Sequence, residues 1–367
     1  MSIVLARIRV RETAGIRRFL YPLSITLPSL SVLKTIETKM PEDIHDKIAL
    51  RTAQGQGVPS QTVCVNFSTR DRIDFAVSLS PGETQEIVVT VDDAPGSLSD
   101  PLQTTLTLDG GLKNTQEHFG ISLSPNGCIS EVVYDGVRHL RGPSRILRNE
   151  EAAWNSSTSN SSCYRFYSQL IAKSRYKDGG FAQTKAALTA CKSWAAVTHT
   201  LEQPKPNDEI VFTLPLAVTS PTLTCDFGVG GYVFGKLDGM AAPEVVWRTE
   251  FGNAPHAWWS VKTAGRVDYV GEVETAEAFL PQRWFHLIDS DKALAVAITK
   301  VPPDCREMTV RLTHGGDVSV AFRLGDTVTG PAEFGVCYHF LNDVPAIAAA
   351  TNPQSILLPP RVEVLPA

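Results

Sequence analysis

The sequence predicts an all-β protein, with a small N-terminal β-barrel or β-sandwich domain followed by a large antiparallel β-sandwich of the supersandwich-like kind. Three observations lead to this fold class. Short runs of β-branched and aromatic residues alternate with polar residues. The 26 glycines and 24 prolines are spread along the chain between these runs, where they mark turns. No stretch of the 367 residues has the periodicity of an amphipathic helix of four turns.

The N-terminal domain is predicted from four short runs of strand length and strand composition, at residues 3–10, 61–67, 73–79 and 85–91. The polar segment 92–101, rich in Pro, Gly, Ser and Asp, follows them and is typical of a linker. We therefore expect a first domain over residues 1–100 and a second domain over residues 101–367.

The second domain continues as a series of strand-length segments that turn residues separate. The polar segment 155–163, made almost entirely of Ser and Asn, predicts an exposed loop. The glycine-rich segment 227–235 predicts a bulged hairpin and not a nucleotide-binding loop, because no strand-to-helix step accompanies its glycines. Only residues 344–353 predict a turn or two of helix.

The charge balance argues against polyanionic partners. The chain has 34 basic and 39 acidic residues, a net charge of −5, and no visible basic stripe. We therefore expect no binding to nucleic acid or to a membrane. The sequence contains no P-loop, nucleophile elbow, HExxH or EF-hand motif, and no recognised metal-ligand spacing. We accordingly expect no cofactor and no metal ion.

The N-terminal segment does not resemble a secretory signal, because it carries a charge at Arg7 and lacks a long apolar core. The longest clean apolar run, residues 293–298, is far shorter than a membrane span. The seven cysteines are scattered without a CxxC pair, as is typical of reduced thiols. We expect a cytoplasmic protein, or a secreted one if a leader was removed. A homo-oligomer is possible as well as a monomer.

Short turn motifs recur in the N-terminal part. Residues 8–28 hold a strand, a Glu-x-Ala-Gly turn, arginines and an apolar strand between prolines, at Glu12, Ala14, Gly15, Arg17, Arg18, Pro22 and Pro28. Two further motifs follow, at Gly55, Val58, Pro59 and Gln61, and at Asp74, Phe75, Pro81, Gly82 and Glu83. The block 119–140 is similar to the strand pair that opens the large sandwich of many carbohydrate-active proteins.

This set of motifs resembles the rhamnogalacturonan exolyase-like family over about residues 1–140. The resemblance implies a RIFT-type β-barrel domain, a carbohydrate-active type of β-sandwich after it, and a sugar-processing or sugar-binding function. Those lyases also carry a large helical toroid, for which residues 141–367 leave no room. No catalytic residue is therefore carried over from the family.

The candidate site lies in residues 247–289, which hold four of the six tryptophans together with Arg, His and carboxylates. Strand alternation puts Arg248 and Glu250 on one face of a strand, and Trp284 and His286 on one face of another. We expect neighbouring strands to pool these side chains on a single surface. The catalytic candidates are Glu250, His256, Glu272 and His286. The substrate-binding candidates are Arg248, Trp258, Trp259, Asp268, Arg283, Trp284, Tyr164 and Arg165.

These residue types suit a saccharide, because sugar rings stack on aromatic side chains and sugar hydroxyls pair with carboxylate and guanidinium groups. Hydrolysis of a glycosidic bond uses two carboxylates, whereas a lyase needs a base and a cation. Arg248 beside Glu250 disfavours a proton-donor role for that carboxylate, so His256, where a loop enters a strand, is the competing acid–base residue.

Three functions stay open. The first is a glycoside hydrolase or polysaccharide lyase that acts on a plant- or microbe-derived saccharide. The second is a non-catalytic carbohydrate-binding module with the same aromatic surface. The third is a structural or assembly protein, in which a partner chain covers the tryptophans. Solvated strand faces and core tryptophans would explain the same residues without any site.

Overall fold

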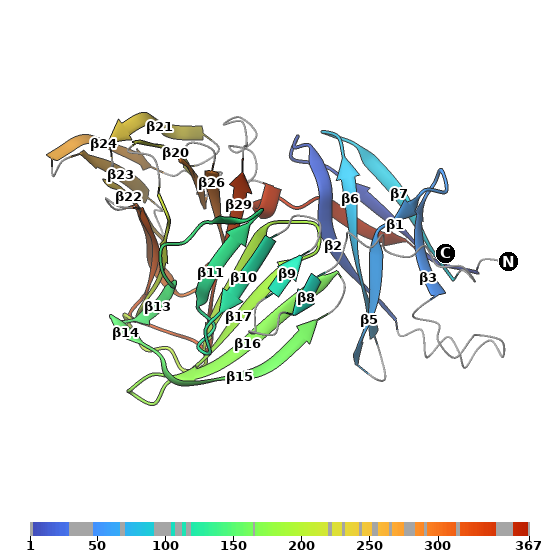
Figure 1. The fold of residues 1–367 in the computed structure, drawn as a ribbon, viewed down its shortest axis with the longest axis horizontal. Helices are drawn as coiled ribbons and strands as arrows, with labels where there is room; N and C mark the ends of the chain where they lie inside the picture. The colour runs from blue at the N-terminus through green and yellow to red at the C-terminus, as the bar shows by residue number, and fades with distance from the viewer. Residues whose placement is uncertain are drawn as a thin grey trace.

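A computed structural model describes most of the chain, with several gaps. The described residues are 3–28, 47–66, 70–91, 104–106, 112–114, 119–163, 166–218, 222–229, 232–241, 244–251, 256–263, 266–274, 283–289, 292–312, 316–342 and 355–365. They form an all-β protein of antiparallel sheets, with one short helical turn at residues 355–357. Figure 1 shows a smaller unit that holds both chain ends beside a larger unit.

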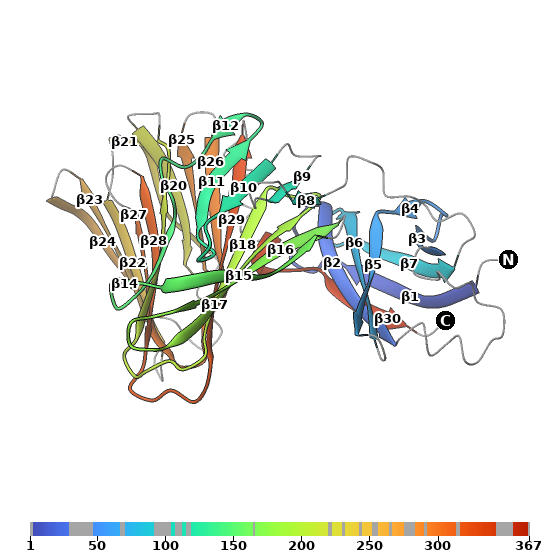
Figure 2. The ribbon, with the colours of Figure 1, turned by 60° about the horizontal axis from the view of Figure 1, so that its bottom comes forward.

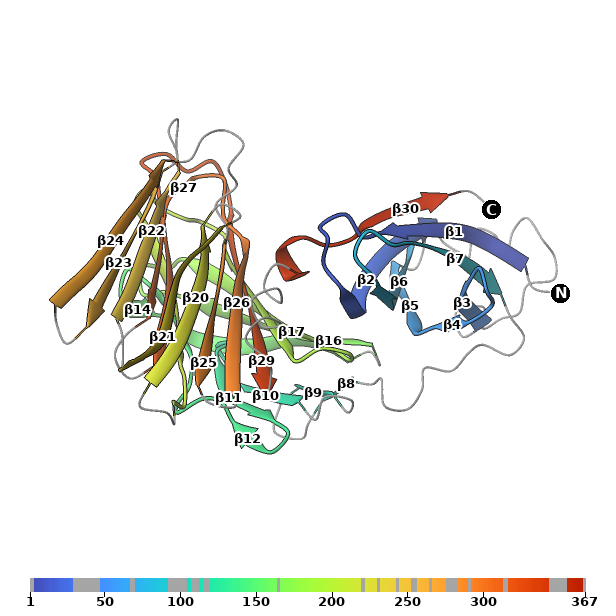
Figure 3. The same cartoon turned by 90° about the horizontal axis from the view of Figure 1, so that it is seen from above.

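The N-terminal unit contains two sheets around one hydrophobic core. The five-stranded sheet has the order β30-β1-β7-β3-β4, with bounds Arg361–Leu365, Ile3–Arg11, Thr84–Val91, Ile48–Thr52 and Gly57–Val58. The three-stranded sheet has the order β2-β6-β5, with bounds Arg18–Pro28, Arg70–Leu79 and Ser60–Asn66. The last strand of the chain, β30, pairs with β1, so the C-terminus returns to the N-terminal unit (Figure 3).

The larger unit contains three sheets. The strands of the nine-stranded sheet are, in spatial order, β15 (Trp154–Cys163), β16 (Tyr167–Arg175), β17 (Phe181–Thr189), β18 (Trp194–Leu201), β29 (Ala332–Asn342), β26 (Lys292–Lys300), β25 (Trp284–Asp289), β20 (Thr222–Val229) and β21 (Tyr232–Ala241). The strands of the eight-stranded sheet are, in spatial order, β14 (Glu151–Ala152), β13 (Arg145–Arg148), β19 (Glu209–Pro215), β28 (Asp317–Leu324), β27 (Cys305–Leu312), β22 (Glu244–Glu250), β23 (His256–Thr263) and β24 (Arg266–Glu274). A five-stranded sheet has the order β12-β11-β10-β9-β8, with bounds Val137–Arg138, Ile129–Tyr134, Phe119–Leu123, Leu112–Asn114 and Thr104–Leu106.

One hydrophobic core joins these three sheets, because strands with period-two alternation bury every second side chain. In β18 each inward residue is buried and each outward residue is half-buried. The five-stranded and nine-stranded sheets pack closely at Gly127, which lies between β10 and β11. A Cβ atom added there would lie 2.7 Å from the Cβ of Thr184 on β17. The backbone there has φ of +80°, which also favours glycine.

The predicted fold class is confirmed, and so is the bulged hairpin, which β20 and β21 form with register shifts near Leu223 and Asp226. The loop expected at residues 155–163 is wrong, since this segment belongs to β15 and pairs with β16. Tertiary pairing here overrides the weak strand propensity of Ser and Asn. The predicted linker 92–101 and helical segment 344–353 lie outside the described residues. The division into two domains at residue 100 stays a prediction.

Several contacts join the two units. The amide of Phe166 donates to Gln61 Oε1 at 2.6 Å. The Lys192 ammonium donates to the carbonyl oxygen of Phe19 at 2.7 Å. The ring of Trp194 meets an aromatic ring of β2 edge-on, at 5.8 Å between centroids. The N-terminal unit is thus packed against the β16–β18 end of the larger unit, as Figure 2 also shows.

Among the described residues, no helix is long and apolar enough to cross a membrane.

Candidate functional site

The candidate site begins on β22, a strand with one buried and one outward face. Thr249 on β22 is buried, as is its register partner Met308 on β27. Arg248 and Glu250 alternate with Thr249 and are half-exposed, so they occupy the outward face that the sequence pattern predicts. In Figures 1 and 2 these strands lie at the end of the molecule opposite to the N-terminal unit.

Arg248 is held between two carboxylates. Its Nη2 atom lies 2.8 Å from Glu250 Oε1 and also makes an ion pair with Glu307 on β27. The side chains of Arg248, Glu250 and Glu307 are 33%, 44% and 17% exposed. The guanidinium thus bridges two neighbouring strands and leaves part of each group open to solvent. Such a cluster offers fixed donors and acceptors to a hydroxylated ligand.

The backbone register extends this cluster across β23 and β24. His256 lies directly opposite Glu250, and Trp258 lies directly opposite Arg248. Glu272 on β24 lies opposite Trp258 in turn. Of the predicted site residues, the structure therefore brings these five to adjacent register positions on three neighbouring strands. His256 is also the first residue of β23, which is the loop-to-strand position that the sequence predicts.

The other predicted residues are placed differently. Trp259 and Asp268 lie on β23 and β24, and Tyr164 and Arg165 lie outside the described residues. The prediction that Trp284 and His286 share the surface of Arg248 is wrong, because both belong to β25 of the nine-stranded sheet.

Trp284 is fully buried, so its indole presents no face to a ligand. Arg283 precedes β25, and its guanidinium carbon lies 5.9 Å from the ring centre of Phe251, which follows β22. Burial lowers the pKa of Arg283. Contact between the predicted site residues and a saccharide stays a prediction.

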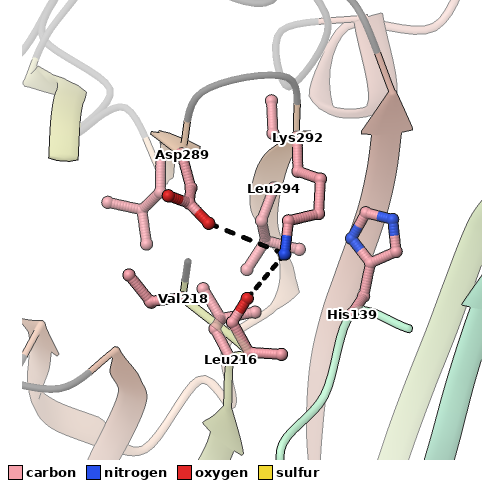
Figure 4. Close-up of a pocket in the computed structure, with 9 residues that line it drawn as sticks. His139, Leu216, Val218, Asp289, Lys292 and Leu294 are labelled. Carbon is pink, nitrogen blue, oxygen red and sulfur yellow. Dashed lines mark hydrogen bonds and ion pairs between the residues drawn. The ribbon is translucent and has the colours of Figure 1, made fainter. Parts of the chain in front are cut away.

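A small pocket that the sequence analysis missed is lined by the end of β25, the start of β26, residues 216–218 that follow β19, and His139 (Figure 4). Its polar lining comes from His139, Asp289 and Lys292. The Lys292 ammonium donates to the carbonyl oxygen of Ala217 at 2.7 Å and lies 3.6 Å from Asp289 Oδ2. The cavity volume is about 20 Å³, enough for one water molecule and too small for a sugar ring. No motif or spacing in the sequence connects these three residues.

The described residues contain no group of three or more His, Cys, Asp or Glu side chains arranged to hold a metal ion.

Comparison with models of known protein families gives no match for this sequence. Comparison with curated protein sequences also gives no match. The exolyase resemblance of the N-terminal motifs thus stays a prediction.

Two solved structures share the fold. One is a protein in glycosyl hydrolase family 38 from Enterococcus faecalis, with a TM-score of 0.57 at 10% identity, over 98% of this chain and 47% of that chain. The other is an alpha-mannosidase from Enterococcus faecalis V583, with a TM-score of 0.57 at 9% identity, over 98% of this chain and 46% of that chain. This chain therefore spans less than half of the length of either protein, and the likeness shows the fold alone.

Proposed function

We propose that this chain is a carbohydrate-active protein that binds a saccharide on the outward face of β22 and its neighbours. The observation that carries the proposal is the Arg248 guanidinium held between Glu250 and Glu307 on a solvent-facing sheet surface. Adjacent hydroxyls of a sugar can donate to the carboxylates while another oxygen accepts from the guanidinium. Because the ion pairs already fix the three side chains, binding costs little further side-chain entropy.

The backbone register supports the same surface. Trp258 lies directly across from Arg248, so an aromatic residue is adjacent to the polar cluster. A sugar ring stacks its C–H face on an aromatic ring while its hydroxyls form hydrogen bonds, so a tryptophan at this register position suits a saccharide.

The shared fold with an alpha-mannosidase supports a carbohydrate-related role but does not transfer that activity, since this chain spans less than half of that protein. The resemblance of the N-terminal turn motifs to the exolyase-like family supports the same class of ligand and leaves the sugar and the linkage open.

Catalysis on this surface is the second candidate, and the position of His256 opposite Glu250 favours it. Histidine and glutamate are residue types that move protons near neutral pH, and here they hold facing register positions. A screen for turnover on neutral glycosides and uronate-containing polysaccharides, with wild type, Glu250→Gln and His256→Ala, tests it. Turnover lost only in His256→Ala supports a lyase-type or histidine-based reaction, and turnover lost only in Glu250→Gln supports hydrolysis. Saccharide binding without any turnover supports a binding module.

The binding proposal is tested by isothermal titration of a panel of neutral oligosaccharides against wild type and Arg248→Gln. We expect the Kd of the best ligand to rise about tenfold in the variant, the equivalent of one lost charge-assisted hydrogen bond. Arg145→Gln removes an exposed arginine from β13 of the same sheet and should leave the Kd unchanged. If no oligosaccharide binds, or if Arg248→Gln binds as wild type does, the proposal fails and a structural or assembly role is favoured.

A further inference from the structure

The outward face of the strands next to the N-terminal unit has an unusual charge pattern. On β16, β17 and β18 the inward side chains are buried, and the outward ones except Ala187 are half-buried or exposed. The outward positions of these strands include Lys173 and Arg175 on β16 and Lys185 on β17, and they include no carboxylate. This contrasts with the chain as a whole, which has more acidic than basic residues. We call Lys173, Arg175 and Lys185 the cationic face.

These three cations form no ion pair with any residue in the part of the chain that the structure describes, whereas nearby cations do. Arg72 pairs with Asp74 at 2.9 Å, for example. Surface cations that form no ion pair leave a positive potential that an anionic ligand can neutralise.

At its far end, the cationic face is flanked by exposed aromatic rings. The register places Trp154 opposite Arg175, and Arg175 opposite Phe181. Trp154 and Phe181 are 54% and 44% exposed, and the Arg175 guanidinium carbon lies 4.2 Å from the Phe181 ring centre. A stacked guanidinium keeps its in-plane donors free for carboxylate oxygens. One cation between two exposed rings therefore matches a ligand that has flat rings and carboxylates.

At its near end, the cationic face meets the N-terminal unit. The ring of Tyr167 on β16 has the Lys185 ammonium at 5.8 Å and the Arg72 guanidinium at 5.4 Å from its centre. Burial lowers the pKa of Lys185, the charges of Arg72 and Lys300 lower it further, and the charge of Glu333 on β29 raises it. The cationic face thus ends at the junction of the two units, where Arg72 and Lys300 are paired with Asp74 and Glu333.

We propose that the cationic face binds an acidic polysaccharide, whose carboxylates pair with Lys173, Arg175 and Lys185 while its sugar rings stack on Trp154 and Phe181. This surface belongs to the nine-stranded sheet, whereas Arg248 belongs to the eight-stranded sheet. The inference is therefore independent of the saccharide surface at Arg248, and either can fail alone.

A polysaccharide fits this face better than nucleic acid does. The net charge of −5 opposes the approach of a polyanion with the charge density of a phosphate backbone. The smaller charge density of a uronate polymer needs only a few cations, and its sugar rings suit the flat aromatic surface.

The experiment measures binding of three polymers to the full-length protein by biolayer interferometry at low and at physiological salt. Alginate provides the uronate polysaccharide, dextran the uncharged one, and single-stranded poly(U) the nucleic acid. We expect alginate to bind most tightly and to weaken as salt rises, since the contacts are between charges near the surface.

The Lys173→Gln/Arg175→Gln double variant should weaken alginate binding about tenfold for each lost cation. Arg175→Lys keeps the charge but loses the stacked planar guanidinium, so it should weaken binding less than the double variant does, while Trp154→Ala should weaken binding with little change in salt dependence. Arg138→Gln removes a 71% exposed arginine of β12 and serves as the matched control, with no expected change. Binding that the double variant does not weaken, absence of alginate binding, or tighter binding of poly(U) than of alginate would overturn the inference.

Discussion

Replacement of Glu12 by Gln should strongly destabilise the N-terminal unit. Glu12 and Arg18 form an ion pair whose side chains are both fully buried, with Arg18 Nε donating to Glu12 Oε2 at 2.5 Å. The amide of Ala14 also donates to Glu12 Oε1 at 2.6 Å. Glu12→Gln keeps the size of the side chain but leaves the Arg18 charge buried without its counter-ion. Breaking a buried ion pair in this way costs about 3–5 kcal/mol.

The same arginine holds the C-terminal segment. Arg18 Nη1 donates to the carbonyl oxygen of Ser355 at 2.7 Å, and Nη2 donates to that of Leu358 at 2.5 Å. These contacts lie just before β30, which pairs with β1. The expected loss of stability in Glu12→Gln should therefore appear as a lower urea midpoint and as faster hydrogen exchange of the β30 amides.

The control is Glu86→Gln, which breaks a half-exposed ion pair with Arg9 in the same sheet. Solvent screens such a pair, so its loss should cost no more than about 1 kcal/mol. Equal urea midpoints for Glu12→Gln and Glu86→Gln would refute the reasoning.

Acid should weaken the same interaction. Burial alone raises the pKa of Glu12, but the hydrogen bonds from Arg18 and Ala14 and the charge of Arg18 lower it more, so the pKa lies below 4.5 in the folded state. The folded protein then binds fewer protons than the unfolded chain below about pH 4.5. The contribution of Glu12 is therefore complete above that pH and is lost as the pH falls through the folded pKa, a dependence that Glu12→Gln should remove.

Three further predictions concern the larger unit. Gly127→Ala should cost about 1–3 kcal/mol more than Gly136→Ala in urea unfolding, because both glycines have positive φ but only the Cβ at position 127 would clash. Asp208→Asn should lower the unfolding free energy by about 3–5 kcal/mol, because Arg148 Nη2 lies 2.7 Å from Asp208 Oδ2 and both side chains are buried. Burial, with a smaller effect of the Arg148 charge, lowers the pKa of His199 from 6.5 to about 4, so its stabilising contribution is complete above pH 6.5 and falls as the pH drops towards 4. Urea midpoints between pH 7 and pH 4 should fall less steeply in His199→Gln, and an unchanged slope would contradict that prediction.

The alternation of apolar and polar residues was enough to predict the fold class and the outward position of Arg248 and Glu250. It could not predict which strands are neighbours, because pairing of strands that are distant in the sequence depends on the whole core. For this reason Trp284 and His286 were assigned to the surface of Arg248, although β25 belongs to the other sheet. Glu307, the second carboxylate of the cluster, lies more than 50 residues from Arg248 and carries no local signal.

Two further features could not be predicted correctly from composition. The Ser- and Asn-rich segment of β15 resembles a loop, yet pairing along β16 makes it a strand. The cationic face was invisible in the sequence because Lys173, Arg175 and Lys185 are separated by other residues and combine only when β16 and β17 pair. By contrast, the Glu12 and Arg18 motif, noticed as a family resemblance, has a clear structural role as a buried ion pair.

The most direct test of the saccharide surface is hydrogen–deuterium exchange of the full-length protein, with and without the best-binding neutral oligosaccharide of the panel. We predict slower exchange in β22, β23 and β24, over residues 244–274, in wild type, and no such protection in Arg248→Gln. Protection confined to other strands, or equal protection in the variant, would contradict the account.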